Sequence, residues 1–415
     1  MTFKGNLLNR IFVFIEENRK WGVFFTLFFT GSFVIGINVY SFGLFIEPLE
    51  KEFGWTREQI SLGYSLSFVG SLIAPLIGKL IDIKGSKIFL VISIFLVSAG
   101  FLLRPLMTNF SHWIILNSMV FAGYPGTLMI PAGVLIQVWF PKTKGRMMGL
   151  ATAGHNFGGL IMPIVTLVLL SCFDWKVSYF IFGILIFFLG IFALILVKNK
   201  PDNFESSSNS RNDINEFEFK AAIRTKQFIT LTLGITFACF TYNGIMPQMV
   251  PHLTTEGLGL LSATFAMTYI GGMGIVSKVI FGRFSEKYSS LYLTCASIIL
   301  QSIALSIILT SQGNVIGIWL GIIIFGIGFG GLGAMIALNI TECFGLKSLS
   351  TIWGTLTFFG IWATFLAPWM MGRIFDITSS YRIGHFIIIG IFLLAIIFLL
   401  ITKSLNKGRN YLLEK

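Results

Sequence analysis

One lysine lies inside a segment that is otherwise apolar and rich in glycine. Lys278 sits within the run from Gly272 to Gly282, which contains no other charged residue. An ammonium group inside a membrane-spanning helix costs about 2.5–3.5 kcal/mol on insertion scales and is normally retained for a function. Binding an anionic ligand would be such a function. The alternative is that the flexible Lys278 side chain reaches water near Arg283, at the end of the segment.

Other polar side chains inside similar apolar segments could hydrogen-bond a ligand. His155 stands among small residues and could bind a ligand or carry a proton, because histidine titrates near pH 6.5. The neutral donors of this kind are Tyr124, Tyr242, Asn243 and Asn339. For each of them, a hydrogen bond to a neighbouring helix explains the residue at least as well.

No arrangement of residues typical of an enzyme is present. The sequence contains neither a Walker-type GxxxxGK[ST] motif nor an HExxH motif. The run from Gly326 to Gly333 lies inside an apolar segment without a preceding strand, which predicts a helix-packing surface rather than a dinucleotide-binding loop. The four cysteines, which show no metal-ligand spacing, are Cys172, Cys239, Cys295 and Cys343. We therefore expect no enzymatic activity, no cofactor and no metal site.

The composition indicates that these residues are carried on helices embedded in lipid. Of the 415 residues, 55% are hydrophobic and 12% are charged, about half of the ~25% charged residues of a soluble domain. The mean hydropathy is +0.83, and apolar stretches of the ~20 residues that cross a bilayer recur along the chain. We predict an all-α polytopic membrane protein whose twelve transmembrane helices lie at residues 21–46, 57–80, 88–108, 113–140, 146–171, 177–197, 227–252, 258–281, 290–310, 315–341, 349–373 and 383–403.

The basic residues orient these spans. With both termini in the cytoplasm, 23 of the 30 Lys and Arg residues fall on the cytoplasmic side and six fall outside. This is the positive-inside pattern, and it explains the net charge of +12 without a nucleic-acid partner. The first twenty residues carry charges of both signs before a full-length span, so we expect no cleaved signal peptide. A multi-pass protein of the cell (inner) membrane is expected.

The chain divides into two similar halves. Residues 198–226 are polar, contain a Ser/Asn-rich run and predict a flexible cytoplasmic linker. We therefore expect one six-helix bundle at 1–197 and a second at 227–415. The segment after the second span, from Gly78 to Asp82, has a counterpart 204 positions later, from Gly282 to Glu286. Repeats in the same direction imply a pseudo-two-fold axis along the membrane normal, with a substrate path between the halves.

The segment from Gly78 to Lys87 resembles the cytoplasmic signature loop of the major facilitator superfamily. Gly78 and Gly85 would allow close approach of helices, and Asp82 could bond the N-terminal amides of a helix from the other half. Such contacts would form a cytoplasmic gate. The alternative is an ordinary tight turn with a solvated Asp82.

The second copy of this loop departs from the superfamily pattern. Its members are Gly282, Arg283 and Glu286, and Ser289 replaces the expected glycine. The arginine that the superfamily usually carries early in the fourth span is missing, and Asn117 lies in that region. The gate contributed by this second loop is therefore less well supported.

Several further motifs resemble the monocarboxylate transporter and oxalate:formate antiporter group. They run from Phe53 to Arg57, from Trp139 to Gly149, from Val250 to Leu253, and from Ala367 to Asp376 followed by Tyr381. In that group a basic residue, usually arginine, stands four positions before the glycine of the second loop and pairs with the substrate carboxylate. The resemblance implies this role for Lys278, although lysine lacks the two-pronged geometry of arginine.

The resemblance implies a secondary transporter of a short-chain monocarboxylate of the lactate or pyruvate type, working by alternating access, with a co-transported proton as a further partner. The acid that animal members carry one turn before the basic residue is Gly274 here, so the usual proton relay lacks this acid. The alternative cargo is another small solute: a zwitterion, a sulfonate, a neutral metabolite or a drug. A third alternative for the class of protein is a membrane sensor or an enzyme. For the oligomeric state we expect a monomer.

Three remaining charged residues lie near span ends, where water is within reach. We predict that Arg104 and Glu47 are solvated or belong to an outer gate, with substrate contact as the alternative. Glu342 lies near the cytoplasmic end of its span, where a role in proton coupling is the functional possibility.

Overall fold

The computed structural model describes residues 3–141, 143–200, 222–345 and 349–413. Within these ranges every regular element is a helix, as predicted, and twelve helical segments are long and apolar enough to cross a membrane. These segments are Asn18–Tyr40, Arg57–Ile81, Ser86–Leu106, Phe110–Trp139, Met147–Cys172, Trp175–Leu196, Lys226–Thr255, Leu260–Ser285, Ser290–Thr310, Val315–Phe344, Ile352–Thr378 and Arg382–Asn406. Most of the predicted 198–226 linker, residues 201–221, lies outside the described residues.

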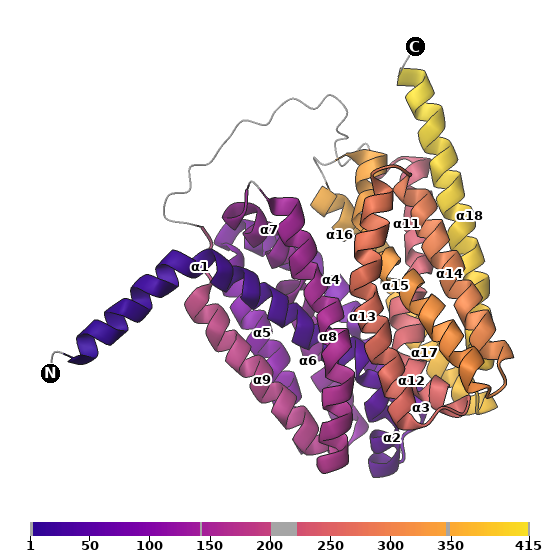
Figure 1. The fold of residues 1–415 in the computed structure, drawn as a ribbon, viewed down its shortest axis with the longest axis horizontal. Coiled ribbons are helices and arrows are strands. Elements are labelled where there is room, and N and C mark those ends of the chain that lie inside the picture. Colours follow the sequence, from indigo (N-terminus) through magenta and orange to yellow (C-terminus); the bar gives the residue numbers. More distant parts are fainter. Residues whose placement is uncertain (1–2, 142, 201–221, 346–348, 414–415) are drawn as a thin grey trace.

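The helices form two bundles that lie side by side (Figure 1). The first half contains α1 (Phe3–Ile35), η1 (Gly36–Tyr40), α2 (Phe42–Phe53), α3 (Arg57–Ser65), α4 (Ser67–Lys84), α5 (Ser86–Leu103), η2 (Arg104–Leu106), α6 (Phe110–Thr127), α7 (Met129–Trp139), α8 (Lys144–Cys172) and α9 (Trp175–Leu196). The second half contains α11 (Lys226–Ala238), η3 (Thr241–Ile245), α12 (Met246–Thr255), α13 (Leu260–Ser285), α14 (Ser290–Thr310), α15 (Val315–Phe344), α16 (Leu349–Phe359), α17 (Ile361–Thr378) and α18 (Arg382–Leu413).

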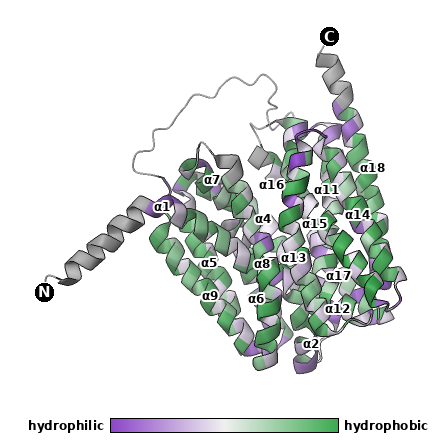
Figure 2. Ribbon diagram, in the orientation of Figure 1, coloured by the Kyte–Doolittle hydropathy of each residue, from purple (hydrophilic) through white to green (hydrophobic). Residues whose placement is uncertain are grey.

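Each bundle has its own apolar core, and the outside of the molecule is apolar as well. One cluster of buried side chains comes from residues 23–197, and the other comes from 222–399 together with Val39, Tyr40 and Leu44 of the first half. Large side chains such as Phe188 and Leu393 are exposed on the outside, and most of the helical ribbon between the two ends has the colour of hydrophobic residues (Figure 2). A surface of this kind must face lipid rather than water. The chain is therefore a multi-pass membrane protein.

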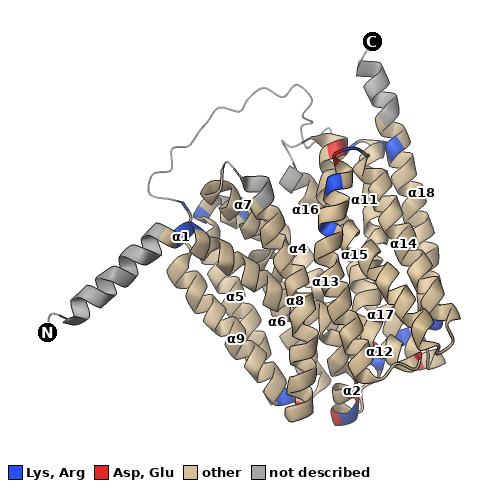
Figure 3. Ribbon diagram, in the orientation of Figure 1, with Lys and Arg blue, Asp and Glu red and all other residues tan. Residues whose placement is uncertain are grey.

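Charged residues concentrate at the two ends of the bundles, with an exception on α13 (Figure 3). We call the end that carries Leu196 and Lys226 the linker side, and the opposite end the distal side. On the distal side, Gly54 ends α2 in the left-handed conformation (φ 64°). Thr56 then caps α3: its hydroxyl accepts from the Gln59 amide, while the Gln59 side chain accepts from the Thr56 amide. These turns place Arg57 at the first position of α3.

The first helix of each half contains one turn of π-helix at equivalent positions. The π turn η1 centres on Asn38 and η3 centres on Asn243, 205 positions later. Both amides donate to the carbonyl four residues earlier, Asn38 to Val34 at 3.0 Å and Asn243 to Cys239 at 3.1 Å. Single π turns inside α-helices are frequent at functional sites. The repeat seen in the sequence therefore extends to a local irregularity of the backbone.

Candidate functional site

The two halves meet at mid-depth where α8 crosses α13. A Cβ added to Gly271 would lie 2.3 Å from the backbone carbon of Gly159, and one added to Gly274 would lie 1.9 Å from the Asn156 side-chain nitrogen. At Gly271 the neighbouring atoms are backbone, so any side chain there would force the two helices apart. The crossing holds one face of α13 against the first half, which brings Lys278 to the boundary between the bundles.

The Lys278 ammonium group contacts the first half. Its Nζ donates to the backbone carbonyl of Thr152 on α8, at 3.2 Å, and the side chain is half-buried. Among the described residues no carboxylate pairs with it. The amine therefore lies between the two bundles and bonds only a neutral acceptor.

Two predicted site residues accompany Lys278. His155 lies one helical turn after Thr152, within electrostatic range of the Lys278 charge, and its ring packs on Gly31 of α1. On the other side, a Cβ on Gly333 would lie 2.9 Å from the Tyr242 hydroxyl and 3.9 Å from the Lys278 Cε. The structure thus gathers a cation, an imidazole and a phenol around one place, from α13, α8 and η3.

Aromatic rings lie beside this group and join the halves. Phe329 of α15 contacts Tyr242 at 5.2 Å between ring centroids and Tyr40 of η1 at 6.1 Å. The Tyr64 hydroxyl of α3 donates to the Tyr242 carbonyl at 3.4 Å. Asn243 is half-buried in the same π turn, and its amide is bonded to the Cys239 carbonyl.

Two other predicted residues lie in different surroundings. The Tyr124 hydroxyl is directed at the Val34 carbonyl of α1, at 3.5 Å, so Tyr124 packs within the first half. Asn339 is fully buried and donates to the Thr294 hydroxyl at 2.8 Å, within the second half. The structure therefore does not bring Asn339 to the group around Lys278.

The predicted gate residues on the linker side are not packed against the other half. A Cβ on Gly78 or Gly282 would meet no heavy atom within 4 Å among the described residues, and Arg283 and Glu286 are exposed. Gly85 adopts a positive φ of 86°. The turn that it forms is bonded within its own half, where Asn199 accepts from the Lys87 amide at 2.7 Å. The side chain of Asp82 is not among those described.

The halves are instead bonded together on the distal side, through a carboxylate of the second half. Asp376 of α17 accepts from the backbone amides of Arg57 and Glu58, at 3.0 and 2.7 Å. These are N-terminal amides of α3, where a helix favours negative charge. A Cβ on Gly372 would lie 2.6 Å from the Arg57 carbonyl oxygen. This glycine lets α17 approach α3 closely enough for the bonds to form.

Side chains extend this contact. Glu58 accepts from the Trp369 indole at 2.8 Å and from Arg373 at 3.0 Å, so a first-half carboxylate binds two α17 residues. The Arg57 guanidinium bonds Glu50 at 2.8 Å and donates to the Tyr381 hydroxyl at 3.0 Å.

A third set of bonds lies behind the first two. Tyr381 donates to Gln248 at 2.9 Å, and Gln248 donates to Ser61 of the first half at 2.7 Å. We call this network the distal lock; its members are Glu50, Arg57, Glu58, Ser61, Gln248, Trp369, Gly372, Arg373, Asp376 and Tyr381.

The lock was not assigned a role from the sequence, although a signal for it exists. The stretch from Gly372 to Asp376 repeats the glycine, basic residue and acid spacing of the segment from Gly78 to Asp82. Asp376, on the distal side, makes the contact that was expected of Asp82. Its carboxylate binds the N-terminal amides of a helix from the other half.

The structure corrects the reading of Arg104. This residue was expected to be solvated near a span end, but its side chain is buried, with 2% exposed. Its guanidinium lies 4.3 Å from the Tyr179 ring centroid and donates to Asn117 at 2.8 Å. The short helix η2 turns Arg104 back into the first bundle. A guanidinium therefore stands beside Asn117, where the superfamily pattern led us to look for an arginine.

The other two charged residues near span ends have partners. Glu47 is exposed and pairs with Lys51, as expected for a solvated residue. Glu342 accepts from Lys403 at 2.7 Å and from the Ser290 amide at 2.7 Å, so it caps α14.

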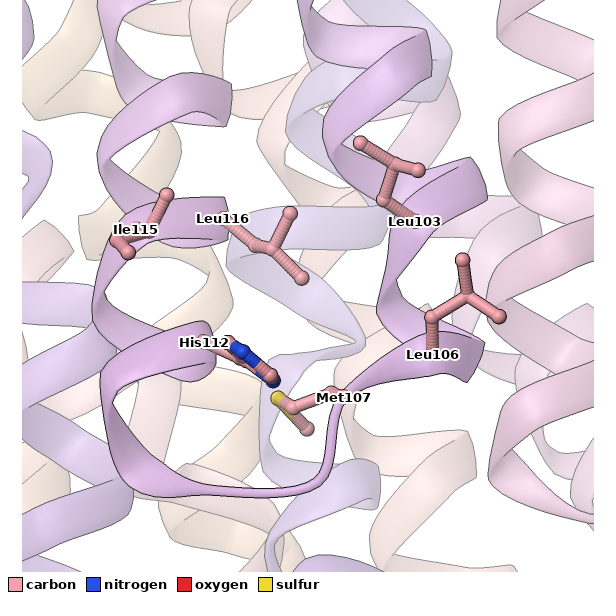
Figure 4. A pocket seen from close by; sticks show the side chains of 6 residues that line it. All are labelled: Leu103, Leu106, Met107, His112, Ile115 and Leu116. Atoms are coloured by element: carbon pink, nitrogen blue, oxygen red, sulfur yellow. The ribbon is translucent and has the colours of Figure 1, made fainter.

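Two cavities lie near the distal side, away from Lys278. The smaller one, about 170 Å³, is an apolar hollow between η2 and α6 with His112 at its edge (Figure 4). The larger one, about 420 Å³, lies between the halves and includes Lys51, Arg57 and Asp174. Its charged groups are already engaged: Lys51 with Glu47, Arg57 with Glu50, and Asp174 as the cap of α9.

Two helical bundles that are joined on one side, with a lysine between them that no carboxylate of the described residues neutralises, are the arrangement of a membrane transporter for small solutes. The Major Facilitator Superfamily model matches residues 28–368, and the chain belongs to this family.

Similar proteins agree with this assignment. The chain is 22% identical over 353 residues to the uncharacterized MFS-type transporter YhjX of Escherichia coli, covering 82% of this chain and 84% of that one. It is 21% identical over 358 residues to human monocarboxylate transporter 12, covering 75% and 66%. A bacterial homologue of the lysosomal transporter Spinster, solved in an inward-facing and occupied conformation, superposes with a TM-score of 0.74 at 14% identity, covering 92% and 96%.

Proposed function

We propose that this protein is a secondary transporter of a small organic anion, a short-chain monocarboxylate of the lactate or pyruvate type. The observation that carries the proposal is the Lys278 ammonium group between the halves, bonded to the Thr152 carbonyl and to no carboxylate of the described residues. A cation kept at this depth is stabilised when an anion binds it. Tyr242 and His155, both near Lys278, would donate to the second carboxylate oxygen or to a hydroxyl group of the substrate.

Transport would proceed by alternating access. The distal lock joins the halves on one side, while Gly78 and Gly282 have open space beside them on the other. With both termini in the cytoplasm of a cell (inner) membrane protein, as the basic residues favour, this form faces inward. Opening the lock and closing the linker-side loops would produce the outward-facing form. The gate residues of that form would be Gly78, Asp82, Gly85, Gly282, Arg283 and Glu286.

A single cation favours monocarboxylates over dicarboxylates, since a second carboxylate would enter an apolar region unpaired. A co-transported proton would make the anion electrically neutral during transport. We assign the proton as the second partner and a monomer as the working unit.

The test is uptake of labelled short monocarboxylates into proteoliposomes. Lys278→Gln keeps a polar side chain but removes the charge, and we expect uptake to fall at least about tenfold, the factor for each ~1.4 kcal/mol of lost binding. Lys287→Gln, an exposed lysine just beyond the end of the same helix, is the matched control. Undiminished uptake by folded Lys278→Gln protein would refute the assignment. Tight binding of neutral solutes without competition by carboxylates would point to the other solute classes.

A further inference from the structure

Two histidines of the second half form a buried pair close to the distal lock. His252 of α12 and His385 of α18 are both fully buried, and their ring centroids are 4.1 Å apart. The Nδ1 of His385 lies 3.0 Å from the Tyr381 carbonyl. Because a carbonyl only accepts, this nitrogen carries the proton. The other three ring nitrogens have no hydrogen-bond partner among the described residues.

The pair is connected to the lock through Tyr381. His385 bonds the backbone of this tyrosine, and the His252 ring meets the Tyr381 ring edge-on at 6.1 Å. The Tyr381 hydroxyl in turn contacts Arg57 and Gln248, both members of the distal lock. One residue therefore separates the imidazoles from the contact between the halves.

The closed lock disfavours a charged imidazole at this place. A buried ring with unsatisfied nitrogens already costs free energy, and a buried charge without a partner costs far more. The charged groups around the pair are Arg382, on the same helix as His385, and Arg57, Glu50 and Asp376, all at Tyr381. Each nearby carboxylate is engaged: Asp376 by the α3 amides, Glu50 by Arg57 at 2.8 Å and Glu256 by Arg382 at 3.1 Å. Among the described residues no free anion is left to balance an imidazolium ion.

We propose that His252 and His385 form a proton-binding site that opens the distal lock. When the lock opens, Arg57 leaves Tyr381 and water reaches Gln248, Tyr381 and the rings behind them. A hydrated imidazole takes up a proton near pH 6.5. The open form therefore binds protons better than the closed form, so a fall in pH on the distal side shifts the population toward the open form. The inference rests on the lock being a gate, but not on the identity of the substrate.

The test measures the distance between the halves on the distal side, without substrate. Spin labels are placed on Cys172, which is exposed at the end of α8, and on Gln312→Cys, in the loop after α14. Cys239, Cys295 and Cys343 are replaced by alanine, and the protein is held in nanodiscs. Between about pH 8 and 5.5, one proton site with a hydrated midpoint near 6.5 can shift the open-to-closed ratio by about tenfold.

Variants separate the pair from other titrating groups. We expect the double variant His252→Gln/His385→Gln to respond little to pH. His112→Gln should respond as the unmodified protein does, since His112 is also distal but faces Thr108. Burial raises the pKa of Glu256, so Glu256→Gln is included, and it should also keep the response. Lys278→Gln should keep it too, which separates this inference from the carboxylate assignment.

Two results would overturn the inference. One is an unmodified protein whose distance distribution does not change with pH. The other is a double variant that titrates as the unmodified protein does. If the glutamine double variant does not fold, His252→Phe/His385→Phe keeps aromatic rings of similar size in the same place. Loss of the pH response in this variant supports the site, and an unchanged response refutes it.

Discussion

Two segments of the molecule share one residue pattern and are used differently. From Gly372 to Asp376, glycine permits close approach to α3 and the acid binds two of its amides. From Gly282 to Glu286, the glycine has open space beside it and the acid is exposed. Among the described residues, only the copy at Gly372 joins the halves in this conformation. Under the proposed mechanism, the linker-side copies would make the equivalent contacts once the distal lock opens.

The largest shift of the population toward the form with an open distal lock is expected from Gly372→Ala. The added methyl group would lie 2.6 Å from the Arg57 carbonyl oxygen and 2.8 Å from the Ser61 hydroxyl. Relieving such overlap costs about 1–3 kcal/mol, so the distal lock should open in a large share of molecules. The Cys172 and Gln312→Cys label pair would report the longer distance. Gly282→Ala is the control. An equal effect of both substitutions would contradict the conclusion that Gly372, and not Gly282, is packed against the other half.

A somewhat smaller effect is expected from Asp376→Asn. The amide can still accept one hydrogen bond, but the charge that favours the start of α3 is lost. We expect a loss of about 1–2 kcal/mol, which corresponds to a shift of about tenfold toward the open form. Glu286→Gln removes an equivalent charge on the linker side and should leave the distance distribution unchanged. A null result for Asp376→Asn would mean that the acid does not hold the lock.

The smallest effect is expected from Glu58→Gln. The Arg373 side chain that pairs with Glu58 is 54% exposed, so solvent screens the interaction, and such pairs contribute about 0–1 kcal/mol. The remaining effect should diminish further in roughly 1 M salt, where the Debye length is near 3 Å. Glu47→Gln, which breaks an exposed pair within one half, is the control. A large effect that persists at high salt would mean that the Glu58–Arg373 pair stabilises the distal lock more than an exposed ion pair usually does.

Much of the architecture could be predicted from the sequence because it depends on local properties. Span length, the charge bias between loops and the 204-position repeat require no knowledge of packing. One charge in an apolar run was enough to single out Lys278, whereas its contact with Thr152 of the other half was seen only in the structure. One prediction failed because it depended on tertiary packing. Arg104 was expected to be solvated or part of an outer gate because it lies near a span end, but η2 folds its side chain into the bundle.

The distal lock and the histidine pair could not be predicted from the sequence, because both depend on contacts between residues that are far apart in the chain. His252 and His385 are far apart in the chain, and only the packing of α12 against α18 joins their rings. The role of Asp376 depends on which side of the transporter is closed, and this is a property of the conformation. Asn339 fits the same sequence criteria as Tyr242, yet it faces α14 within its own bundle.

The bond from Lys278 to the Thr152 carbonyl has a consequence for the empty transporter. If Lys278 binds the substrate as proposed, the Thr152 carbonyl oxygen of α8 takes the place of a substrate oxygen in the empty protein, so the ammonium group retains an acceptor after the substrate leaves. The substrate-free protein can therefore return to its other conformation without leaving the Lys278 ammonium group unbonded in the membrane interior. The rate of net uptake should then approach the rate of substrate exchange, because the transporter would return empty almost as fast as it returns with substrate bound.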